Sequence, residues 1–286
     1  MEKPKHVIIV ENGSKEQSKP LGEEIRRYLS GLSIPATVVR TNGTDQPLAV
    51  PEQTELAISL GGDGTVLYCA RFLHDLGIPI IAVNLGTFGY ITEISKDEWK
   101  DTLDAYLAGR LQLSRRLMVR VDVVRGHRKV FSCMGLNEMV VTSSGISKVV
   151  NLKMELDDIY AGTFRADGMI VATPTGSTGY SLAAGGPILD VNLDDLIVTP
   201  VCPFSLSNRP LVVNGETEVS IEVLHGQRTG LMLTVDGQQN FPLEEGDEVT
   251  VEKARSKVLI VRSPHRSSVD IIREKLGWSR GGWNHA

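Results

Sequence analysis

The first third of the chain alternates short apolar runs with segments of helical periodicity. The apolar runs predict buried strands at 6–10, 36–40, 55–60 and 78–85. Apolar residues that recur every three or four positions predict helices at 21–32, 65–76 and 96–109. Strands that alternate with helices are typical of a parallel, doubly wound sheet, so we expect an α/β domain here.

Near residue 113 the pattern changes to a period of two, which is typical of half-buried strands. It predicts strands at 118–126, 150–158, 217–226, 230–237, 247–254 and 257–263. Turn residues separate many of these runs, as Arg125-Gly126 does. This part of the chain is therefore predicted to be a mostly β domain.

The chain ends with one more predicted helix, at 268–278, which carries Val269, Ile272 and Leu276 on one face. A single helix after a β domain must bury its apolar face against another element, so we expect it to return to the first domain. The predicted organisation is a discontinuous α/β domain and a β-rich domain between its two parts. The α/β domain takes 1–114 and 263–286, and the β-rich domain takes 115–262.

Composition narrows the possible classes of protein. The 286 residues are 41% hydrophobic and 23% charged, which is normal for a globular chain, and the formal net charge of −5 argues against nucleic acid as a partner. No apolar stretch approaches the ~20 residues of a membrane helix, and the first apolar run ends at Glu11, too early for a signal peptide. We therefore expect a cytoplasmic protein that does not bind a membrane.

The cysteines and histidines show no pattern of metal or disulfide chemistry. The three cysteines lie more than sixty residues apart, and the six histidines have no metal-ligand spacing. We expect three buried, reduced thiols and no dedicated metal site.

The first candidate for chemistry is Gly61-Gly62-Asp63-Gly64, which joins a predicted strand to a predicted helix. The free N–H groups and dipole of a helix N-terminus attract anions, so Gly61, Gly62, Gly64 and Thr65 are candidate phosphate contacts. No lysine lies between 61 and 70, and no third glycine follows, so neither the Walker loop nor the dinucleotide fingerprint fits. The Asp63 carboxylate either caps the helix in a tight turn or accepts a proton from an attacking hydroxyl.

A second candidate segment, 164–188, is rich in hydroxyl groups and glycine. The hydroxyl groups lie within nine residues, on Thr173, Thr175, Ser177, Thr178, Tyr180 and Ser181. We interpret this segment as a loop that hydrogen-bonds a polar ligand such as a nucleotide, and the alternative is an ordinary surface loop. Before it, Asn137 and Glu138 start an apolar strand and could bind a sugar or a base. The later segment 234–239 is most simply a hairpin turn.

Taken in order along the chain, these motifs resemble those of the NAD kinases. The motifs are GGDGT (61–65), NLGTFGY (84–90), NE (137–138), RADG (165–168), TPTGSTGYSLAAGGP (173–187), LSNRPLV (206–212) and VDGQ (235–238). The resemblance implies a phosphofructokinase-like α/β domain, a β-rich domain and a final segment that rejoins the first. It also implies transfer of the γ-phosphoryl group of ATP, with Mg²⁺ or another divalent cation, to the adenosine ribose 2′-hydroxyl of NAD, giving NADP. Family members are usually homodimers or homotetramers, with NAD bound between domains and partly across subunits.

The resemblance also implies roles for individual residues. Asp63 is expected to be the proton acceptor. The expected NAD contacts are Asp63, Gly64, Tyr90, Asn137, Glu138, Lys148, Arg165, Asp167, Thr178, Gly179, Tyr180, Ser181, Leu182, Ala183 and Gln238. Phe204 departs from the family pattern, because histidine is common at that position.

Two other functions remain open at this point. A lipid kinase of the diacylglycerol type also carries a GGDG loop, although the sequence has no amphipathic basic helix suited to a membrane. A regulator could bind NAD without phosphorylating it. Formation of NADP from Mg-ATP and NAD separates these alternatives.

Overall fold

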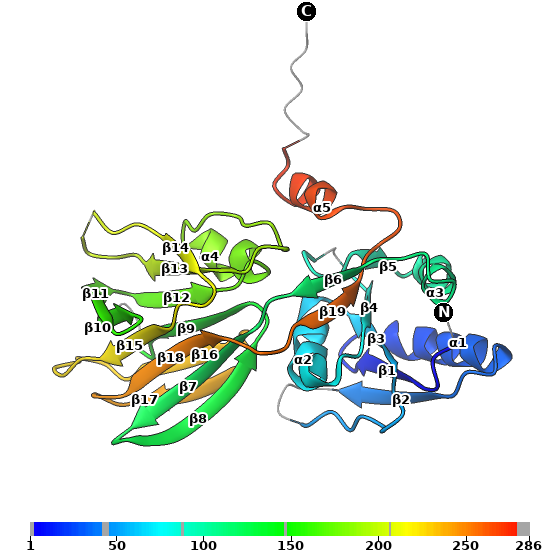
Figure 1. Cartoon of the computed structure of the whole chain (residues 1–286), viewed down its shortest axis with the longest axis horizontal. Coiled ribbons are helices and arrows are strands. Elements are labelled where there is room, and N and C mark those ends of the chain that lie inside the picture. The colour runs from blue at the N-terminus through cyan, green and yellow to red at the C-terminus, as the bar shows by residue number, and fades with distance from the viewer. Residues whose placement is uncertain (1–2, 42–45, 87–88, 146–147, 206, 279–286) are drawn as a thin grey trace, which may run out of the picture. The chain divides into compact units, whose positions relative to one another are not determined.

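The computed structural model describes residues 3–41, 46–86, 89–145, 148–205 and 207–278. The chain divides into two compact units, the first made of 1–115 and 259–286 and the second of 116–258. The structure is mixed α/β and rich in strands, which confirms the coarse fold class expected from the pattern (Figure 1). In the described part of the chain, no helix is long and apolar enough to cross a membrane.

The first unit is built on one sheet whose strands run in the order β2-β1-β3-β4-β19-β6, with β5 paired to β4. The pairs β1–β2, β1–β3, β3–β4, β4–β5 and β4–β19 are parallel. Its elements are β1 (Val7–Asn12), α1 (Ser18–Gly31), β2 (Ala36–Thr41), β3 (Leu56–Gly61), α2 (Asp63–Leu73), a 3-10 turn (His74–Leu76), β4 (Ile80–Asn84), β5 (Ile94–Ser95), α3 (Trp99–Leu107), β6 (Leu113–Arg116), β19 (Val258–Val261) and α5 (Ser268–Lys275).

Helices cover both faces of this sheet. Val7 and Ile9 of β1 share an apolar cluster with buried side chains of α1 and α3. The alternate residues Ile8 and Val10 are equally buried, and since successive strand residues face opposite sides, they face the other side of the sheet. There α2 packs on β1, β3 and β4.

The direction of the chain reverses between β1 and β3. From β1 the chain moves to β2 on one side, and β3 then pairs with β1 on the other side. In open α/β sheets, ligands bind outside the carboxyl ends of the strands at such a reversal. The carboxyl ends at this reversal are Asn12 and Gly61, so the fold places the glycine loop where a ligand is expected.

The second unit contains two six-stranded antiparallel sheets, in the orders β11-β10-β15-β18-β7-β8 and β14-β13-β12-β9-β16-β17. Its elements are β7 (Val119–Arg125), β8 (Arg128–Gly135), β9 (Glu138–Ser143), β10 (Val150–Leu156), β11 (Ile159–Ala166), β12 (Gly168–Ala172), a 3-10 turn (Gly176–Thr178), α4 (Tyr180–Ala183), β13 (Asp195–Val201), β14 (Leu211–Asn214), β15 (Val219–Val223), β16 (Leu231–Val235), β17 (Gln239–Leu243) and β18 (Glu248–Lys253).

One apolar cluster joins the two sheets of the second unit. It contains Val121 and Ile221 from the first sheet together with Val141 and Leu233 from the second. A smaller cluster on the other face of the second sheet is covered by Ala184 and Leu189, which follow the hydroxyl-rich segment.

The expectation of three buried thiols is confirmed only for Cys69. Cys69 is buried and Cys133 half-buried, but Cys202 is exposed. Cys202 lies in a turn with φ of 44°, so its side chain is outside the sheet that ends at Val201. Burial raises the pKa of the Cys69 thiol to about 12, so that thiol stays protonated and unreactive.

Candidate active site

The glycine loop sits between β3 and α2, and its aspartate does not cap its own helix. Gly62 is the N-cap residue, in an extended conformation, and Asp63 is the first residue of α2. No side chain accepts a capping hydrogen bond there. The alternative in which Asp63 is a simple N-cap is therefore wrong.

The Asp63 carboxylate instead holds the loop that precedes β5. Its Oδ2 accepts a hydrogen bond from the Tyr90 N–H at 2.8 Å. Its Oδ1 accepts three, from the Ile91 N–H at 3.2 Å, the Thr92 N–H at 3.0 Å and the Thr92 hydroxyl at 2.9 Å. Among the described residues Oδ2 has this single partner, so it retains an accessible lone pair on a half-exposed side chain.

Two of the glycines around Asp63 are required by close packing. A methyl group at Gly89 would overlap the Asp63 carboxylate, and one at Gly61 would overlap the Thr65 hydroxyl. A methyl group at Gly62, in contrast, would have nothing within 4 Å. Close packing within the protein therefore does not explain why residue 62 is glycine, whereas the close approach of a ligand would explain it.

Thr65 faces the interior. It is buried, and its hydroxyl oxygen accepts a hydrogen bond from Asn12 Nδ2 at 3.1 Å, across the reversal between β1 and β3. Gly64 is exposed beside it. In this conformation the Thr65 hydroxyl is engaged with Asn12.

The second unit repeats the arrangement seen at Asp63, with a different aspartate. Asp236 lies in the turn after β16, and its carboxylate accepts hydrogen bonds from three consecutive N–H groups. These are Leu136 at 2.8 Å, Asn137 at 2.7 Å and Glu138 at 3.1 Å. Asp236 was predicted only as part of a hairpin turn, but it is buried and fixes the Asn-Glu pair at the start of β9.

The Asn-Glu pair keeps polar atoms without partners. Glu138 Oε2 and Asn137 Oδ1 are buried and have no hydrogen-bond partner among the described residues. Burial raises the pKa of the Glu138 carboxyl to about 8, and the nearby charge of Asp236 adds to the shift. Glu138 is therefore mostly protonated at neutral pH, and it can donate a hydrogen bond as well as accept one.

Most hydroxyl groups of the segment 173–181 hold the protein itself together. Thr173 donates to the Leu136 carbonyl, Ser177 to the Pro174 carbonyl and Thr178 to the Thr175 carbonyl. Ser181 shares a buried hydrogen bond with Thr199. These local hydrogen bonds shape the loop, and ligand binding by the segment stays a prediction.

Backbone proximity is what brings this segment to the Asn-Glu pair. A methyl group at Gly176 would overlap the Asn137 carbonyl, and one at Gly179 would lie 3.0 Å from Glu138 Oε2. Tyr180 and Ala183 are exposed, and Leu182 is half-buried. The structure thus places the Asn-Glu pair next to the hydroxyl-rich segment, although the two lie about forty residues apart in the sequence.

The other predicted NAD contacts lie at the surface. Lys148, Arg165 and Asp167 are exposed, and Gln238 is half-buried in the turn after Asp236. The Arg165 guanidinium lies over the Phe204 ring, 5.1 Å from its centre. In the first unit, Tyr90 is half-buried, and the Lys275 ammonium lies 5.8 Å from its ring centre.

Comparison with known proteins decides the family. The model of the ATP-NAD kinase N-terminal domain matches residues 44–111, and that of the C-terminal domain matches 136–263. An NAD kinase from Treponema denticola is 39% identical over 275 residues, covering 96% of this chain and 97% of that protein. The chain belongs to the NAD kinase family. An NAD kinase from Moorella thermoacetica is 43% identical over 219 residues, 77% of this chain and 70% of that protein.

Solved NAD kinase structures share the fold. A yeast NADH kinase complexed with NADH superimposes with a TM-score of 0.87 at 23% identity, covering 100% of this chain and 91% of that one. An NAD kinase from Archaeoglobus fulgidus in complex with ATP has a TM-score of 0.74 at 26% identity, covering 96% of this chain and 98% of that one.

Within this NAD kinase family member, sequence reasoning missed two residues that shape the site. Asp236 was hidden in a turn motif, although its φ of 52° is unusual for a residue other than glycine. Thr92 carries no motif, yet its N–H and hydroxyl both bind Asp63. The VDGQ motif marks Asp236 only as part of a turn, and no motif marks Thr92, because each side chain acts on a segment far away in the chain.

Proposed function

We propose that this chain transfers the γ-phosphoryl group of ATP to the 2′-hydroxyl of the adenosine ribose of NAD, forming NADP and ADP. The observation that carries the proposal is the Asp63 carboxylate, fixed by four hydrogen bonds at the carboxyl end of β3, with Oδ2 still able to accept another. Membership of the NAD kinase family supports the choice of substrates.

In this mechanism the 2′-oxygen attacks the γ-phosphorus, and the bond to the β–γ bridging oxygen breaks. ADP leaves with that electron pair, and the hydroxyl proton passes to Asp63 Oδ2. Phosphoryl transfer has a loose transition state in which the proton can leave late, so a carboxylate is a sufficient acceptor. Asp63 then mainly orients the hydroxyl.

The remaining assignments follow from the same proposal. The N–H groups at Gly62 and Gly64 bind the donor phosphates. Gly61 and Thr65 contribute to phosphate binding by shaping that loop. Asn137 and Glu138 bind NAD through their unpartnered polar atoms. Tyr90, Lys148, Arg165, Asp167, Gln238 and the segment 178–183 complete the NAD contacts, with Gly64 and Asp63 beside the acceptor hydroxyl.

Three further expectations stay part of the proposal. The two chain units take the roles expected of the phosphofructokinase-like domain and the NAD-binding domain. Mg²⁺ or another divalent cation arrives with ATP. In the described residues, no group of three or more His, Cys, Asp or Glu side chains could hold a metal ion. A homodimer or homotetramer in the cytoplasm is the expected form, on the resemblance to the family.

The test is a coupled assay with Mg-ATP and NAD, read through an NADP-specific dehydrogenase. We expect NADP to form at a rate proportional to the amount of protein. Binding of NAD without NADP formation would contradict the proposal in favour of a regulator. Phosphorylation of diacylglycerol in its place would indicate a lipid kinase.

A further inference from the structure

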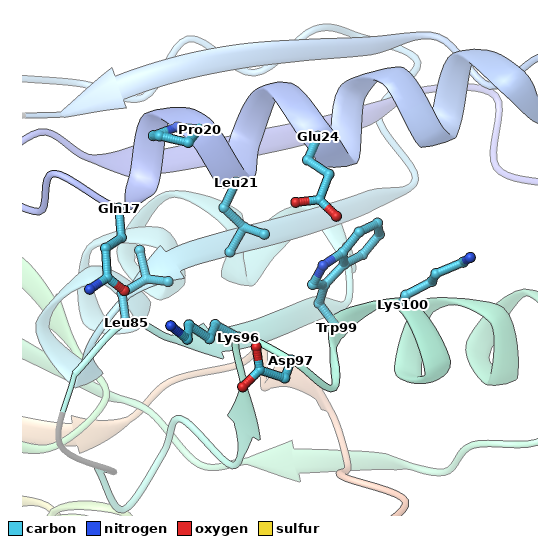
Figure 2. Close-up of a pocket in the computed structure, with 9 residues that line it drawn as sticks. All are labelled: Gln17, Pro20, Leu21, Glu24, Leu85, Lys96, Asp97, Trp99 and Lys100. Atoms are coloured by element: carbon cyan, nitrogen blue, oxygen red, sulfur yellow. The ribbon is translucent and has the colours of Figure 1, made fainter.

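Two regions of the molecule differ in how their cations are balanced. In the cavity between α1 and α3 of the first unit, charges of both signs share the lining (Figure 2). Lys96 lies beside Asp97, and Lys100 lines the end that also holds Glu24, so the cavity presents no excess of positive charge to a ligand. Arg165 of the second unit has no such neighbour. Its guanidinium group has no ion pair or hydrogen bond to another described residue.

The contact that the Arg165 side chain does make is with the ring of Phe204. The guanidinium carbon lies over the ring, 5.1 Å from its centre, which is within the ~6 Å at which a cation is attracted to an aromatic face. The Phe204 side chain is 75% exposed. Since single exposed apolar side chains are ordinary, it is the pairing with Arg165 that gives this ring a role.

Two backbone hydrogen bonds hold the segments that carry these side chains. The Phe204 N–H donates to the Arg165 carbonyl at 2.8 Å, and the Asp167 N–H donates to the Val201 carbonyl at 2.9 Å. Together they join the end of β11, an edge strand, to the turn that follows β13. The backbone therefore fixes which ring lies next to Arg165.

The turn that carries Phe204 has an unusual conformation. Cys202 has a φ of 44°, which few residues other than glycine adopt, although Pro203 favours an extended conformation in the residue before it. Such a conformation costs free energy and persists where the surrounding structure enforces it. The two hydrogen bonds flank Cys202 and enforce it here, and the result is an aromatic ring beside Arg165.

A guanidinium group that contacts a ring keeps its hydrogen-bond donors. The attraction is to the face of the ring and uses none of the five N–H donors, which stay available for oxygen atoms of a ligand. An arginine side chain also loses rotational freedom when it binds, and a contact that restricts it beforehand reduces that loss. Arg165 is therefore oriented in advance for a ligand that carries acceptor oxygens.

We propose that Phe204 is a positioning residue for the dinucleotide: its ring holds the Arg165 guanidinium group in the orientation in which that group binds an acceptor oxygen of NAD. This inference rests on the proposed function, in which Arg165 contacts NAD. It also gives a physical meaning to the departure from the family pattern at position 204. A histidine there gains a positive charge as pH falls through about 6.5 and then repels Arg165, whereas a phenylalanine ring keeps the contact at every pH.

A double-mutant cycle tests this role, with Kd for NAD measured by isothermal titration calorimetry and kcat by the coupled assay. Phe204→Leu removes the aromatic face and keeps an apolar side chain. We expect it to raise Kd for NAD about two- to fivefold, the size of one exposed cation–π contact, with kcat and KM for ATP within about twofold of the parent. Arg165→Gln should raise Kd for NAD about tenfold, the effect of one charge-assisted contact. Because Phe204 acts through Arg165, adding Phe204→Leu to Arg165→Gln should change Kd by less than about twofold.

Two further variants separate the ring from a general effect of the surface. Phe204→Tyr keeps an aromatic face, so it should retain the Kd of the parent. Val130→Ala is the matched control, because it shortens another exposed apolar side chain of the second unit, on the edge strand β8 at the opposite side of the sheet from β11. It should change neither Kd for NAD nor kcat.

The outcomes distinguish this inference from the proposed function. An unchanged Kd for NAD in Phe204→Leu, or losses that multiply in the double variant, would overturn the positioning role and leave the proposed function standing. Failure of the parent to form NADP, together with the expected order of Kd values, would overturn the phosphoryl transfer and leave the role of Phe204 in NAD binding standing. Absence of NAD binding to the parent would overturn both.

Discussion

Two aspartates, one in each unit, hold a distant loop in the same way, yet the two sites differ in what they leave available. Asp63 binds the N–H groups of residues 90–92, and Asp236 binds those of 136–138. Asp63 is half-exposed, and its own carboxylate can still accept a proton. Asp236 is buried, and so is its neighbour Glu138, whose Oε2 has no hydrogen-bond partner among the described residues.

This difference separates two uses of a carboxylate that binds several backbone N–H groups. A carboxylate that accepts several backbone N–H groups is well placed to order a loop, whether or not it also takes part in a reaction. Exposure and an unused lone pair support our proposal that Asp63 is the reacting group. The raised pKa of Glu138 follows from burial beside Asp236, so that carboxyl is suited to binding in its neutral form.

The largest expected change in stability comes from Asp236→Asn. Asparagine tolerates the positive φ of this position, so the substitution changes mainly the charge and one acceptor atom. One buried N–H among residues 136–138 then loses its acceptor, at a cost of about 2–3 kcal/mol. Urea unfolding followed by far-UV circular dichroism measures this loss, and titration with NAD should show weaker binding. A stability within 0.5 kcal/mol of the parent, a margin of about the size of ordinary surface substitutions, would contradict the structural role.

The glycine loop offers a pair of variants that separates packing from ligand approach. Gly61→Ala places a methyl group against Thr65 and should destabilise the first unit by about 1–3 kcal/mol. Gly62→Ala meets no protein atom, so it should fold normally and still lower kcat/KM for ATP about tenfold by obstructing phosphate. Tryptophan fluorescence follows the first unit, since all three tryptophans belong to its chain segments. Equal effects of Gly61→Ala and Gly62→Ala on kcat/KM for ATP would contradict the distinction between protein packing and ligand approach.

Glu138→Gln tests whether the buried carboxyl is protonated. Because its pKa is raised to about 8 from 4.5, the folded protein holds a proton between these values that the unfolded chain has lost, and stability falls as pH rises through that window. The glutamine variant lacks this fall, which amounts to ~4 kcal/mol over three pH units, so its Tm relative to the parent should increase by about 8 °C from pH 5 to pH 8. A parallel pH dependence of the two proteins would show that Glu138 is ionised at neutral pH.

A fourth carboxylate, Glu98, provides a contrast because its main partner is a cation. Burial alone would raise its pKa, but hydrogen bonds from Arg266 at 2.7 and 2.8 Å and from the Ser95 N–H outweigh burial and lower it to about 2. Its stabilising contribution is present above pH 4.5 and is lost as pH falls toward 2. Glu98→Gln should cost about 1 kcal/mol at pH 7 and almost nothing near pH 2, by tryptophan fluorescence during urea unfolding.

The sequence pattern predicted central strands better than edge strands. The central strands predicted at 118–126, 150–158, 217–226 and 230–237 are confirmed within a few residues, at 119–125, 150–156, 219–223 and 231–235. The missed strands include all four sheet edges of the second unit, β8, β11, β14 and β17. Edge strands here are mostly exposed and lack a regular apolar alternation, so periodicity gives little signal for them. The missed central strand β13 contains Pro200, a residue that argues against a strand interior.

For the site, local motifs located the glycine loop and the Asn-Glu pair but not the contacts that hold them. The role of Asp63 toward residues 90–92 and of Asp236 toward 136–138 depends on tertiary structure, which no local spacing encodes. The hydroxyl-rich segment shows a further limit of local reasoning. Its composition predicts a ligand loop, and only the structure shows that most of its hydroxyl groups also form hydrogen bonds within the protein.

The most direct test of the account is kcat of Asp63→Asn at saturating NAD and Mg-ATP, measured beside Thr92→Val and Asp236→Asn. Thr92→Val removes one hydrogen bond to the same carboxylate and leaves the carboxylate in place. We predict that Asp63→Asn lowers kcat by about 100-fold or more with NAD affinity near that of the parent, and that each of the other two lowers kcat by less than about tenfold. A kcat for Asp63→Asn within about tenfold of the parent, or equal losses in all three, would contradict the assignment of Asp63 as the proton acceptor.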